Sequence, residues 1–310
     1  METVKLGNSD LRVSRICFGC EPLGGVDWGF VSIKEAKRAA CRAYELGINF
    51  FDTADVYGLG RSEEMLADAL GANRSKAVIA TKFGVGWSTQ AGDERAVTFR
   101  DASPGAVVKC LEDSLRRLRI DQVPLYQLHW PDPKTRFEDT AEALARCVKA
   151  GKIRYVGVCN LPPAAISEMS EFIPLVTVQM QYSILEHDAS APAFETATRL
   201  GIGKSAYGCL AQGLLTGKYS PTSTFLESDR RSRLPHFHPA SQSRIQPVIE
   251  SLKKTALLLD KSMTQLAIRW VLDMGIDVAV VGAKTPEQVE QCAASLGWKL
   301  PPLELTRLTA

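Results

Sequence analysis

The chain has 310 residues, of which 45% are hydrophobic and 23% charged, and its formal net charge at pH 7 is +2. This length can bury the core of one large α/β domain or of two smaller ones. Because the basic residues are dispersed and nearly balanced by acidic ones, we expect no nucleic-acid or membrane partner and predict that the protein binds small molecules.

The amino terminus has no apolar signal core, and no later apolar run approaches the length of a membrane span, so we expect a cytoplasmic protein. The eight cysteines are scattered, unlike the disulfide framework of a short secreted chain, and we expect free thiols. Cys17 and Cys20 form one Cys-x-x-Cys without the second pair of a zinc site. His236 and His238 lie in a polar loop, where we expect them at the surface, and we predict no metal site.

Residues 3–6 and 11–13 are short alternating segments on either side of a turn sequence, which predicts a β-hairpin before the main fold. After it, short apolar runs alternate with stretches of helical period. The predicted strands cover residues 16–19, 49–52, 77–82, 124–129, 154–160, 175–179, 202–207 and 278–281. The predicted helices cover residues 32–46, 62–70, 104–118, 137–150, 162–169 and 190–200, with 249–259 and 264–274 before the last strand and one from about 285 after it.

Eight strands, each followed by a helix, predict the α/β class and a (β/α)8 TIM barrel. We expect a single domain over residues 1–310, with an N-terminal β-hairpin and extra helices before and after the eighth strand. A doubly wound open sheet is the alternative, but no Gly-x-Gly-x-x-Gly follows an early strand and no linker divides the chain.

A long polar segment, residues 219–246, breaks the alternation of strands and helices after the seventh strand. Loops of this length are usually functional, and we expect a lid. Its arginines Arg230, Arg231 and Arg233 either reach phosphate groups or form a solvated charged surface.

Three polar residues stand at the ends of successive predicted strands: Asp52, Lys82 and His129. Alone, these are readily explained as a turn or cap residue, a surface lysine and a core histidine. In a barrel, however, the carboxyl ends of all strands meet in one mouth, so together they predict a compact polar cluster. Tyr57 lies in the loop after the first of them.

This cluster suits general acid catalysis at a phenol. An ammonium group at Lys82 lowers the pKa of Tyr57, and Asp52 keeps Lys82 charged and oriented. A neutral His129 hydrogen-bonds and orients a carbonyl oxygen. The sequence therefore predicts protonation of an oxygen while another group attacks the carbon.

Several runs resemble the signatures of the aldo-keto reductases, in the right order from the hairpin to about residue 299. They include Asp52-Thr-Ala-Asp-Val-Tyr-Gly58, Leu128-His-Trp-Pro-Asp-Pro133, Gly151 to Asn160, Leu210 to Tyr219 and Val281 to Gln288. The Trp-Pro-Asp-Pro run is similar to the branch that contains general-stress and inositol-related oxidoreductases. The resemblance implies a barrel, NADP(H), and hydride transfer between nicotinamide and an aldehyde, ketone, aldose or alcohol. It assigns Tyr57 as acid/base, Asp52 and Lys82 as its tuners, and His129 as the substrate orienter.

The resemblance also implies a set of cofactor contacts. Asn160 and Gln179 would hold the carboxamide, Tyr207 would stack on the nicotinamide, and the turn from 208 to 218 would wrap the pyrophosphate. Lys284, before a helix start, would hold a 2′-phosphate, which favours NADP over NAD. The full set is Asn160, Gln179, Tyr207, Gly208, Leu210, Gln212, Gly213, Lys218, Gly282, Lys284, Thr285, Gln288 and Gln291.

Three positions depart from the family pattern. Cys159 stands in place of the usual Ser, Tyr207-Gly-Cys-Leu lacks the usual Ser-Pro, and Gln291-Cys292 replace a Glu and an Asn near the adenine. We therefore expect weaker cofactor affinity than is usual for the family.

The expected pocket walls are Trp28, Trp87 and Trp130, in the loops after the first, third and fourth strands. Two alternatives remain at this point. The same groups serve a sugar or alcohol dehydrogenase working in the oxidative direction. A nucleotide-sensing regulatory subunit could use the same barrel, although the complete polar cluster and the lack of an added interaction segment argue against it.

Overall fold

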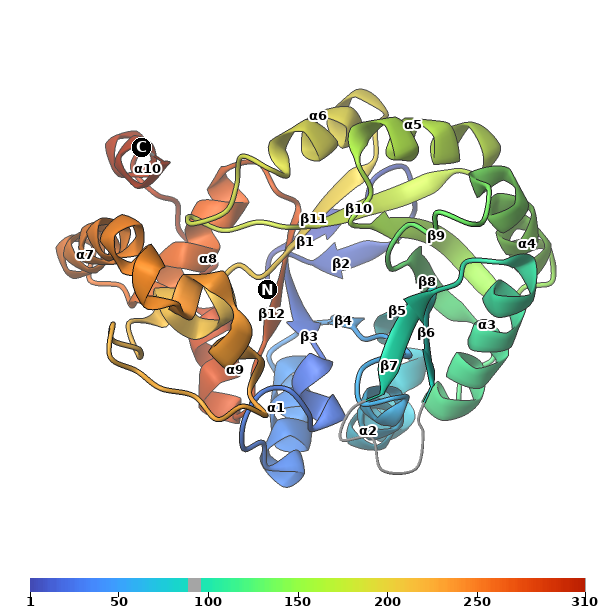
Figure 1. The fold of residues 1–310 in the computed structure, drawn as a ribbon, viewed down its shortest axis with the longest axis horizontal. Coiled ribbons are helices and arrows are strands. Elements are labelled where there is room, and N and C mark those ends of the chain that lie inside the picture. Colours follow the sequence, from blue (N-terminus) through green and yellow to red (C-terminus); the bar gives the residue numbers. More distant parts are fainter. Residues whose placement is uncertain (89–95, 310) are drawn as a thin grey trace.

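The computed structural model describes residues 1–88 and 96–309. Eight parallel strands form a closed barrel, with each strand hydrogen-bonded to the next one along the chain and the last to the first (Figure 1). They are β3 (Ile16–Gly19), β4 (Phe50–Asp52), β5 (Val78–Phe83), β8 (Val123–Leu128), β9 (Ile153–Cys159), β10 (Leu175–Gln181), β11 (Gly203–Tyr207) and β12 (Val278–Gly282). The predicted (β/α)8 barrel is confirmed, and the open-sheet alternative is wrong.

Helices surround the barrel and connect its strands (Figure 1). They are α1 (Ile33–Glu45), α2 (Arg61–Leu70), α3 (Pro104–Leu118), α4 (Phe137–Lys149), α5 (Pro163–Phe172), α6 (Ala191–Arg199), α7 (Gln242–Leu258), α8 (Met263–Asp273), α9 (Pro286–Ala293) and α10 (Pro302–Thr309). Side-chain caps start several of them: Ser32 and Ser103 accept from backbone amides, and Ser262 forms a capping box with Gln265. Among the described residues, no helix is both long and apolar enough to cross a membrane.

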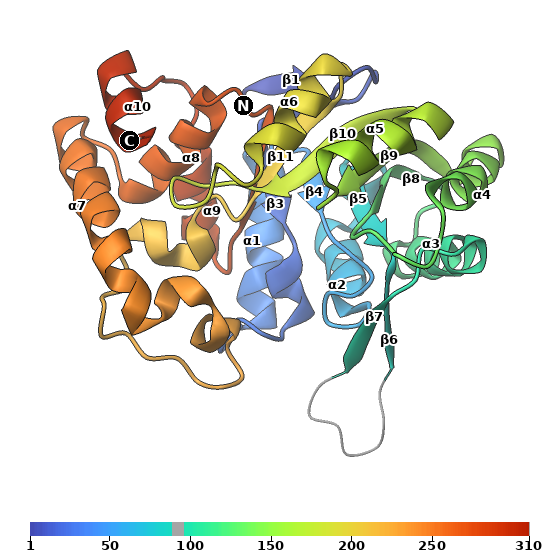
Figure 2. The same ribbon diagram turned by 45° about the horizontal axis from the view of Figure 1, so that its top comes forward.

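The N-terminal hairpin covers one end of the barrel (Figure 2). Its strands are β1 (Thr3–Lys5) and β2 (Arg12–Ser14). Leu6, Leu11 and Val13 are buried in one cluster with barrel residues such as Phe50 and Ala80. Among the described residues, this apolar plug fills the barrel interior at the amino ends of the strands.

A second hairpin, β6 (Val85–Ser88) with β7 (Val97–Arg100), follows β5 and was not predicted. All four residues of β7 are exposed, although Val97 and Phe99 alternate with Thr98 and Arg100 as in a strand. This hairpin and the long segment after β11 project from the same end of the barrel, on opposite sides of the view (Figure 2).

The long segment is shorter than predicted, because α7 begins at Gln242. Pro247 lies inside that helix, and a proline normally indicates a helix boundary, which explains the error. The remaining residues 219–241, which we call the strap, contain three short 3-10 turns: η4 (Arg230–Arg233), η5 (Pro235–Phe237) and η6 (Pro239–Ser241).

Candidate active site

Strand alternation directs polar side chains into the mouth of the barrel. Phe50 and Ala80 face the interior apolar cluster. Because side chains two residues further along a strand point to the same side, Asp52 and Lys82 lie above that cluster. Both are buried, with relative exposures of 3% and 0%.

Asp52 and Lys82 form a buried ion pair. The Lys82 Nζ lies 2.5 Å from Asp52 Oδ1 and also donates to the carbonyl oxygen of Thr53 at 2.9 Å. Burial alone would favour the neutral amine, but the adjacent carboxylate outweighs it, and the pKa of Lys82 is raised. Lys82 therefore carries its charge throughout the neutral pH range.

Two glutamines complete the surroundings of Asp52. Its Oδ2 accepts hydrogen bonds from Gln179 Nε2 at 2.9 Å and from Gln127 Nε2 at 3.3 Å. Gln179 was predicted to hold the nicotinamide carboxamide, whereas Gln127 was not predicted as a site residue. In this structure one N–H of the Gln179 amide orients Asp52, and its Oε1 and second N–H remain for other partners.

The Tyr57 hydroxyl lies within reach of this ion pair, 3.4 Å from Lys82 Nζ. Its pKa is nevertheless raised, because burial outweighs the lowering effect of Lys82, and the charges of Glu21 and Asp52 act in the same direction as burial. The expectation of a net lowered pKa is therefore wrong. Tyr57 is held protonated at neutral pH, and Lys82 reduces the cost of losing that proton.

The loop that carries Tyr57 is fixed by a close backbone contact. Gly58 has φ +59°, and a Cβ at this residue would lie 2.4 Å from the carbonyl oxygen of Gly24. Ser62 Oγ donates to the carbonyl oxygen of Cys20 at 2.7 Å. The loops after β3 and β4 therefore lock together, and only glycine fits at position 58.

His129 stands beside Tyr57, with ring centroids 5.8 Å apart and the rings nearly perpendicular. Burial, reinforced by Lys82 and Arg100, holds the pKa of His129 well below its usual range. Its Nδ1 is buried without a hydrogen-bond partner among the described residues. The neutral ring can therefore carry its hydrogen on Nε2 and donate it to a ligand oxygen.

Asn160 bridges the mouth to the end of β11. Its φ is +59°, an uncommon left-handed conformation that asparagine tolerates. Nδ2 donates to the carbonyl oxygen of His129 at 3.0 Å, and Oδ1 accepts from the Tyr207 hydroxyl at 2.8 Å. The structure thus brings Asn160 and Tyr207 together next to the polar cluster. Both the amide nitrogen and the amide oxygen of the Asn160 side chain are hydrogen-bonded within the protein.

The turn after β11 is an irregular 3-10 segment, η3 (Ala211–Thr216). Gln212 and Gly213 interrupt it with φ values of 54° and 94°. Gly208 also has a positive φ, and Leu210 packs against the main core. A Cβ on Gly213 would come within 3.1 Å of the Tyr219 ring, so the turn requires glycine there.

Three cationic side chains, those of Lys218, Arg231 and Lys284, lie near one another close to this turn and the end of β12. Burial, together with the positive charges of Arg231 and Lys218, lowers the pKa of Lys284, whereas Asp229 opposes the shift. Three cations thus share one nearby carboxylate, an arrangement that suits a phosphate group. Lys284 Nζ donates to the carbonyl oxygen of Trp28 at 2.5 Å in this structure.

The predicted contacts around α9 are largely engaged within the protein. Thr285 Oγ1 caps the helix at the Gln288 amide, and Gln288 Oε1 accepts from the Lys284 amide at 2.7 Å. Gln291 Oε1 accepts from the Ser262 hydroxyl on the neighbouring helix. Gly282 ends β12 opposite Gly19. Of these residues, only Lys284 brings a charge to the cation group.

Ion pairs fasten the strap to the loop after β3. Arg230 pairs with Glu21 and stacks over the Trp28 ring at 5.2 Å, and Arg233 pairs with Asp27 at 3.1 Å. These two arginines are therefore engaged in ion pairs, although Arg233 is still exposed to solvent. Trp28 Nε1 is buried without a partner among the described residues, so the indole is enclosed by these contacts.

The other two predicted pocket tryptophans are associated with the β6–β7 hairpin. Trp87 lies in β6 itself and not in a loop. Trp130 follows His129, and the Arg100 guanidinium lies 4.7 Å from its ring centroid. Sequence reasoning missed Arg100, because nothing in the sequence pairs residues 85–88 with residues 97–100.

Of the two loop histidines, His238 is exposed as predicted, whereas His236 differs from the surface prediction. His236 is only 5% exposed, and its Nε2 lies 2.9 Å from Glu186 Oε1, far away in the sequence. Cys17 and Cys20 are buried and free. In the part of the chain that the structure describes, no group of three or more His, Cys, Asp or Glu residues could hold a metal ion.

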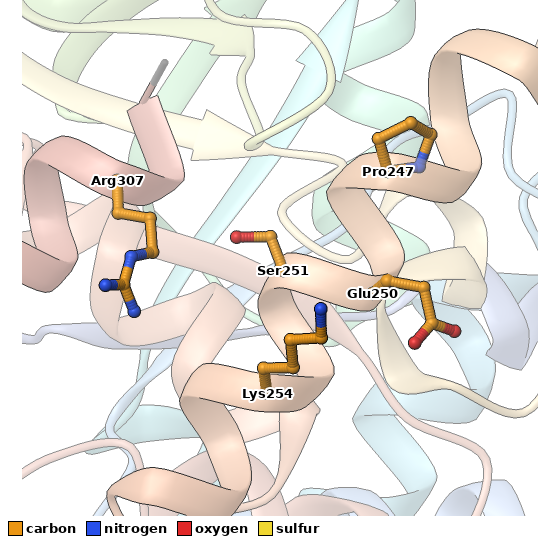
Figure 3. A pocket seen from close by; sticks show the side chains of 5 residues that line it. All are labelled: Pro247, Glu250, Ser251, Lys254 and Arg307. Atoms are coloured by element: carbon orange, nitrogen blue, oxygen red, sulfur yellow. The ribbon is translucent and has the colours of Figure 1, made fainter.

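A surface hollow of about 480 Å³ lies outside the barrel between α7 and α10. Figure 3 shows the Ser251 side chain of α7 pointing toward Arg307 of α10. This hollow lies on the outer helical layer and contains no residue of the polar cluster, so the candidate active site is the mouth of the barrel.

Comparisons with known proteins agree with this geometry. The family model described as the aldo/keto reductase family matches residues 15–310. The aldo-keto reductase YhdN of Bacillus subtilis (strain 168) is 34% identical over 304 residues, covering 97% of this chain and 90% of that protein. The aldo-keto reductase yakc [NADP(+)] of Schizosaccharomyces pombe is 29% identical, covering 96% and 87%.

Solved structures are similar over the whole chain. The glycerol dehydrogenase AKR11B4 from Gluconobacter oxydans superimposes with a TM-score of 0.91 and 36% identity, covering 99% of this chain and 93% of that one. The holo form of the aldo-keto reductase AKR11C1 from Bacillus halodurans gives a TM-score of 0.81 and 29% identity, covering 100% and 97%. The chain therefore belongs to the aldo/keto reductase family of oxidoreductases.

Proposed function

We propose that the protein is an NADP(H)-dependent oxidoreductase that interconverts a carbonyl compound and an alcohol, with Tyr57 as the general acid and base. The observation that carries this proposal is the chain from Asp52 through Lys82 to the Tyr57 hydroxyl, with contacts of 2.5 and 3.4 Å, beside the neutral ring of His129.

In the direction of reduction, Tyr57 donates its proton to the carbonyl oxygen. The raised pKa of Tyr57 keeps that proton available at neutral pH. The Lys82 ammonium stabilises the phenolate that remains, and Asp52 keeps Lys82 charged. In the direction of oxidation the same phenolate accepts the proton of the alcohol.

His129 orients the reacting oxygen. As a neutral imidazole with hydrogen on Nε2, it donates a hydrogen bond to the oxygen that Tyr57 protonates. Its lowered pKa means that this role does not change between about pH 6 and 8. Two donors thus converge on one oxygen, an arrangement that selects carbonyl and hydroxyl groups.

The residues at the mouth fit a dinucleotide. Gln179 Oε1 is left for a carboxamide amide, Asn160 Oδ1 holds the Tyr207 hydroxyl, and the glycine turn after β11 allows close approach of a pyrophosphate. A bound nicotinamide would supply or accept the hydride. Because Lys218, Arg231 and Lys284 outnumber the single nearby carboxylate, the site suits the additional phosphate of NADP.

The oxidative direction is the second candidate. It is favoured by the similarity to a structure described as a glycerol dehydrogenase. Because Tyr57 serves both directions, the choice rests on the substrate and on which cofactor form is used.

The test uses purified protein with NADPH, NADH, NADP and NAD against a panel of aldehydes, ketones, aldoses and cyclic alcohols, followed by absorbance at the nicotinamide band. We expect turnover with the NADP(H) forms of the cofactor. Tight NADPH binding without turnover of any compound would support a regulatory subunit instead, and lack of NADP(H) binding would overturn the proposal altogether.

A further inference from the structure

The β6–β7 hairpin places Arg100 beside the mouth of the barrel, where the residue remains exposed and its guanidinium lies over the Trp130 ring. In the register of the hairpin, Val85 is opposite Arg100 and Trp87 is opposite Thr98. Opposite residues of an antiparallel pair share a face, so Arg100 lies on the same face as Trp87. Val85 on that face is only 5% exposed, which shows that this face packs toward the barrel.

The guanidinium of Arg100 is held next to His129. It lies 4.7 Å from the ring centroid of Trp130, the residue that follows His129. Its charge contributes to the lowered pKa of His129, and partial burial lowers the pKa of Arg100 itself. A partly desolvated positive charge therefore acts on the group that would orient the reacting oxygen.

This charge has no counter-ion in residues 1–88 and 96–309, where no carboxylate forms an ion pair with Arg100. The arginines of the strap differ, since Arg230 and Arg233 are paired with Glu21 and Asp27. Guanidinium groups bind carboxylates and phosphates through two parallel hydrogen bonds, and stacking on an indole keeps the plane oriented. Arg100 is thus a pre-oriented anion receptor.

The cofactor phosphates are not its partner. The proposed phosphate contacts follow β11 and β12, whereas Arg100 follows β5. In the barrel order β10-β11-β12-β3-β4-β5-β8-β9, these positions lie on opposite sides of the mouth. The anion that meets Arg100 therefore belongs to the substrate.

We infer that Arg100 is a specificity-determining residue that binds an anionic group, a carboxylate or a phosphate, on the carbonyl or alcohol substrate. This inference rests on the proposed function. The substrates are oxo acids, hydroxy acids or phosphorylated carbonyl compounds, in which His129 and Tyr57 hold the reacting oxygen and Arg100 holds the charged end.

The experiment compares charged and neutral substrates of matched skeleton. The carboxylate arm uses 4-oxobutanoate and its methyl ester, and the phosphate arm uses glyceraldehyde 3-phosphate and glyceraldehyde. Each is assayed with wild type, Arg100→Gln, Arg100→Lys and Arg199→Gln. Arg199 is an exposed arginine at the C-terminal end of α6, which lies at the opposite end of the barrel from the mouth, so it controls for net charge.

Wild type should prefer the charged member of at least one pair, and the arm in which it does so identifies the anion. Arg100→Gln should raise KM for that substrate by about 10- to 100-fold, with kcat and the KM for NADPH nearly unchanged. The neutral member should change less than about twofold, Arg100→Lys should restore part of the loss, and added salt should weaken the preference.

Two results overturn the inference alone: turnover of the panel without any preference for charge, or equal losses on charged and neutral substrates in Arg100→Gln. A loss of the same size in Arg199→Gln also overturns it, because the effect would then be one of net charge. Absence of turnover with every compound contradicts the proposed function itself, and the inference with it.

Discussion

Removing one member of the Asp52–Lys82 pair should destabilise the fold strongly. The Lys82 side chain has no exposed surface and that of Asp52 is 4% exposed, at a separation of 2.5 Å. Removal of one partner of such a pair leaves an uncompensated buried charge and costs about 3–5 kcal/mol. Since domains of ordinary stability unfold with about 5–15 kcal/mol, Asp52→Asn or Lys82→Met should lose a fifth or more of the total.

The assay is equilibrium urea unfolding at pH 7 followed by tryptophan fluorescence, because Trp270 is completely buried in the main core. The double variant Asp52→Asn/Lys82→Met should be less destabilised than the sum of the single variants, by about 1–3 kcal/mol. Lys37→Met is the matched control. Lys37 pairs with Asp68 at 3.3 Å with side-chain exposures of 34% and 31%, and such surface pairs contribute about 0–1 kcal/mol.

The loss of folding stability caused by Asp52→Asn should also depend on pH. In the wild type, Asp52 raises the pKa of Lys82 in the folded state. Charged Lys82 therefore stabilises the fold fully below its unfolded-state pKa of about 10.4, and this stabilisation is lost only when the pH exceeds the raised folded-state pKa. Without the carboxylate, burial lowers the folded pKa below about 10.4. Between these two values the unfolded state binds one more proton, so the stability of the variant should rise with pH.

Single variants within about 1 kcal/mol of wild type, or strictly additive effects in the double variant, would refute this reasoning. Such a result would mean that water or structural relaxation compensates the charge of the remaining partner.

Three further predictions concern the loop of Tyr57 and the cation group. Gly58→Ala should lose about 2–5 kcal/mol of stability and reduce turnover, because φ is +59° and Gly24 O lies 2.4 Å from the new Cβ. Gly151→Ala, at φ +75° with nothing within 4 Å, should lose only about 1–2 kcal/mol, and equal urea midpoints for the two variants would contradict the contact. Burial and the charge of Glu63 raise the pKa of Asp55 to about 7. Between about pH 4 and 7 Asp55 is therefore protonated in the folded state but ionised in the unfolded state, so the free energy of unfolding falls as pH rises. Asp55→Asn should remove this fall in stability, which amounts to up to about 4 kcal/mol at pH 8. If the free energies of unfolding of wild type and variant change in parallel from pH 4.5 to 8, the prediction is contradicted. Lys284→Met should raise the dissociation constant for NADPH by about tenfold in a fluorescence titration and leave that for NADH nearly unchanged, and equal losses would contradict a 2′-phosphate contact.

The barrel and the position of its polar cluster could be predicted because both follow from local sequence. Buried parallel strands are short apolar runs bounded by turns, and Asp52, Lys82 and His129 each end such a run. Once the barrel is assumed, strand ends meet in one mouth. The Asp52–Lys82 contact then follows from topology alone.

The remaining features depend on distances that no local pattern encodes. The β7 strand has only four residues, all exposed, so its alternation of Val97 and Phe99 with Thr98 and Arg100 is a weak signal, and Arg100 was missed with it. His236 is buried against Glu186, which is 50 residues earlier in the chain. The net pKa of Tyr57 depends on how burial compares with a nearby ammonium, and only the three-dimensional surroundings decide that balance.

Gln127 is an instructive intermediate case. It lies two residues before His129 on β8, so strand alternation alone directs it inward beneath the histidine. Side chains along a strand point alternately inward and outward. Counting this alternation back from the polar residue at each strand end could therefore have predicted the hydrogen bond from Gln127 to Asp52.

The central claim is that Tyr57 transfers the proton, and Tyr57→Phe tests it most directly. The measurement is the single-turnover rate of the variant with NADPH and the best carbonyl substrate of the panel, alongside NADPH affinity and urea unfolding. We expect the rate to fall by about 100- to 10,000-fold, with affinity and stability nearly unchanged, because only the donated proton is lost. A rate within tenfold of wild type in a folded, NADPH-binding variant would contradict the assignment.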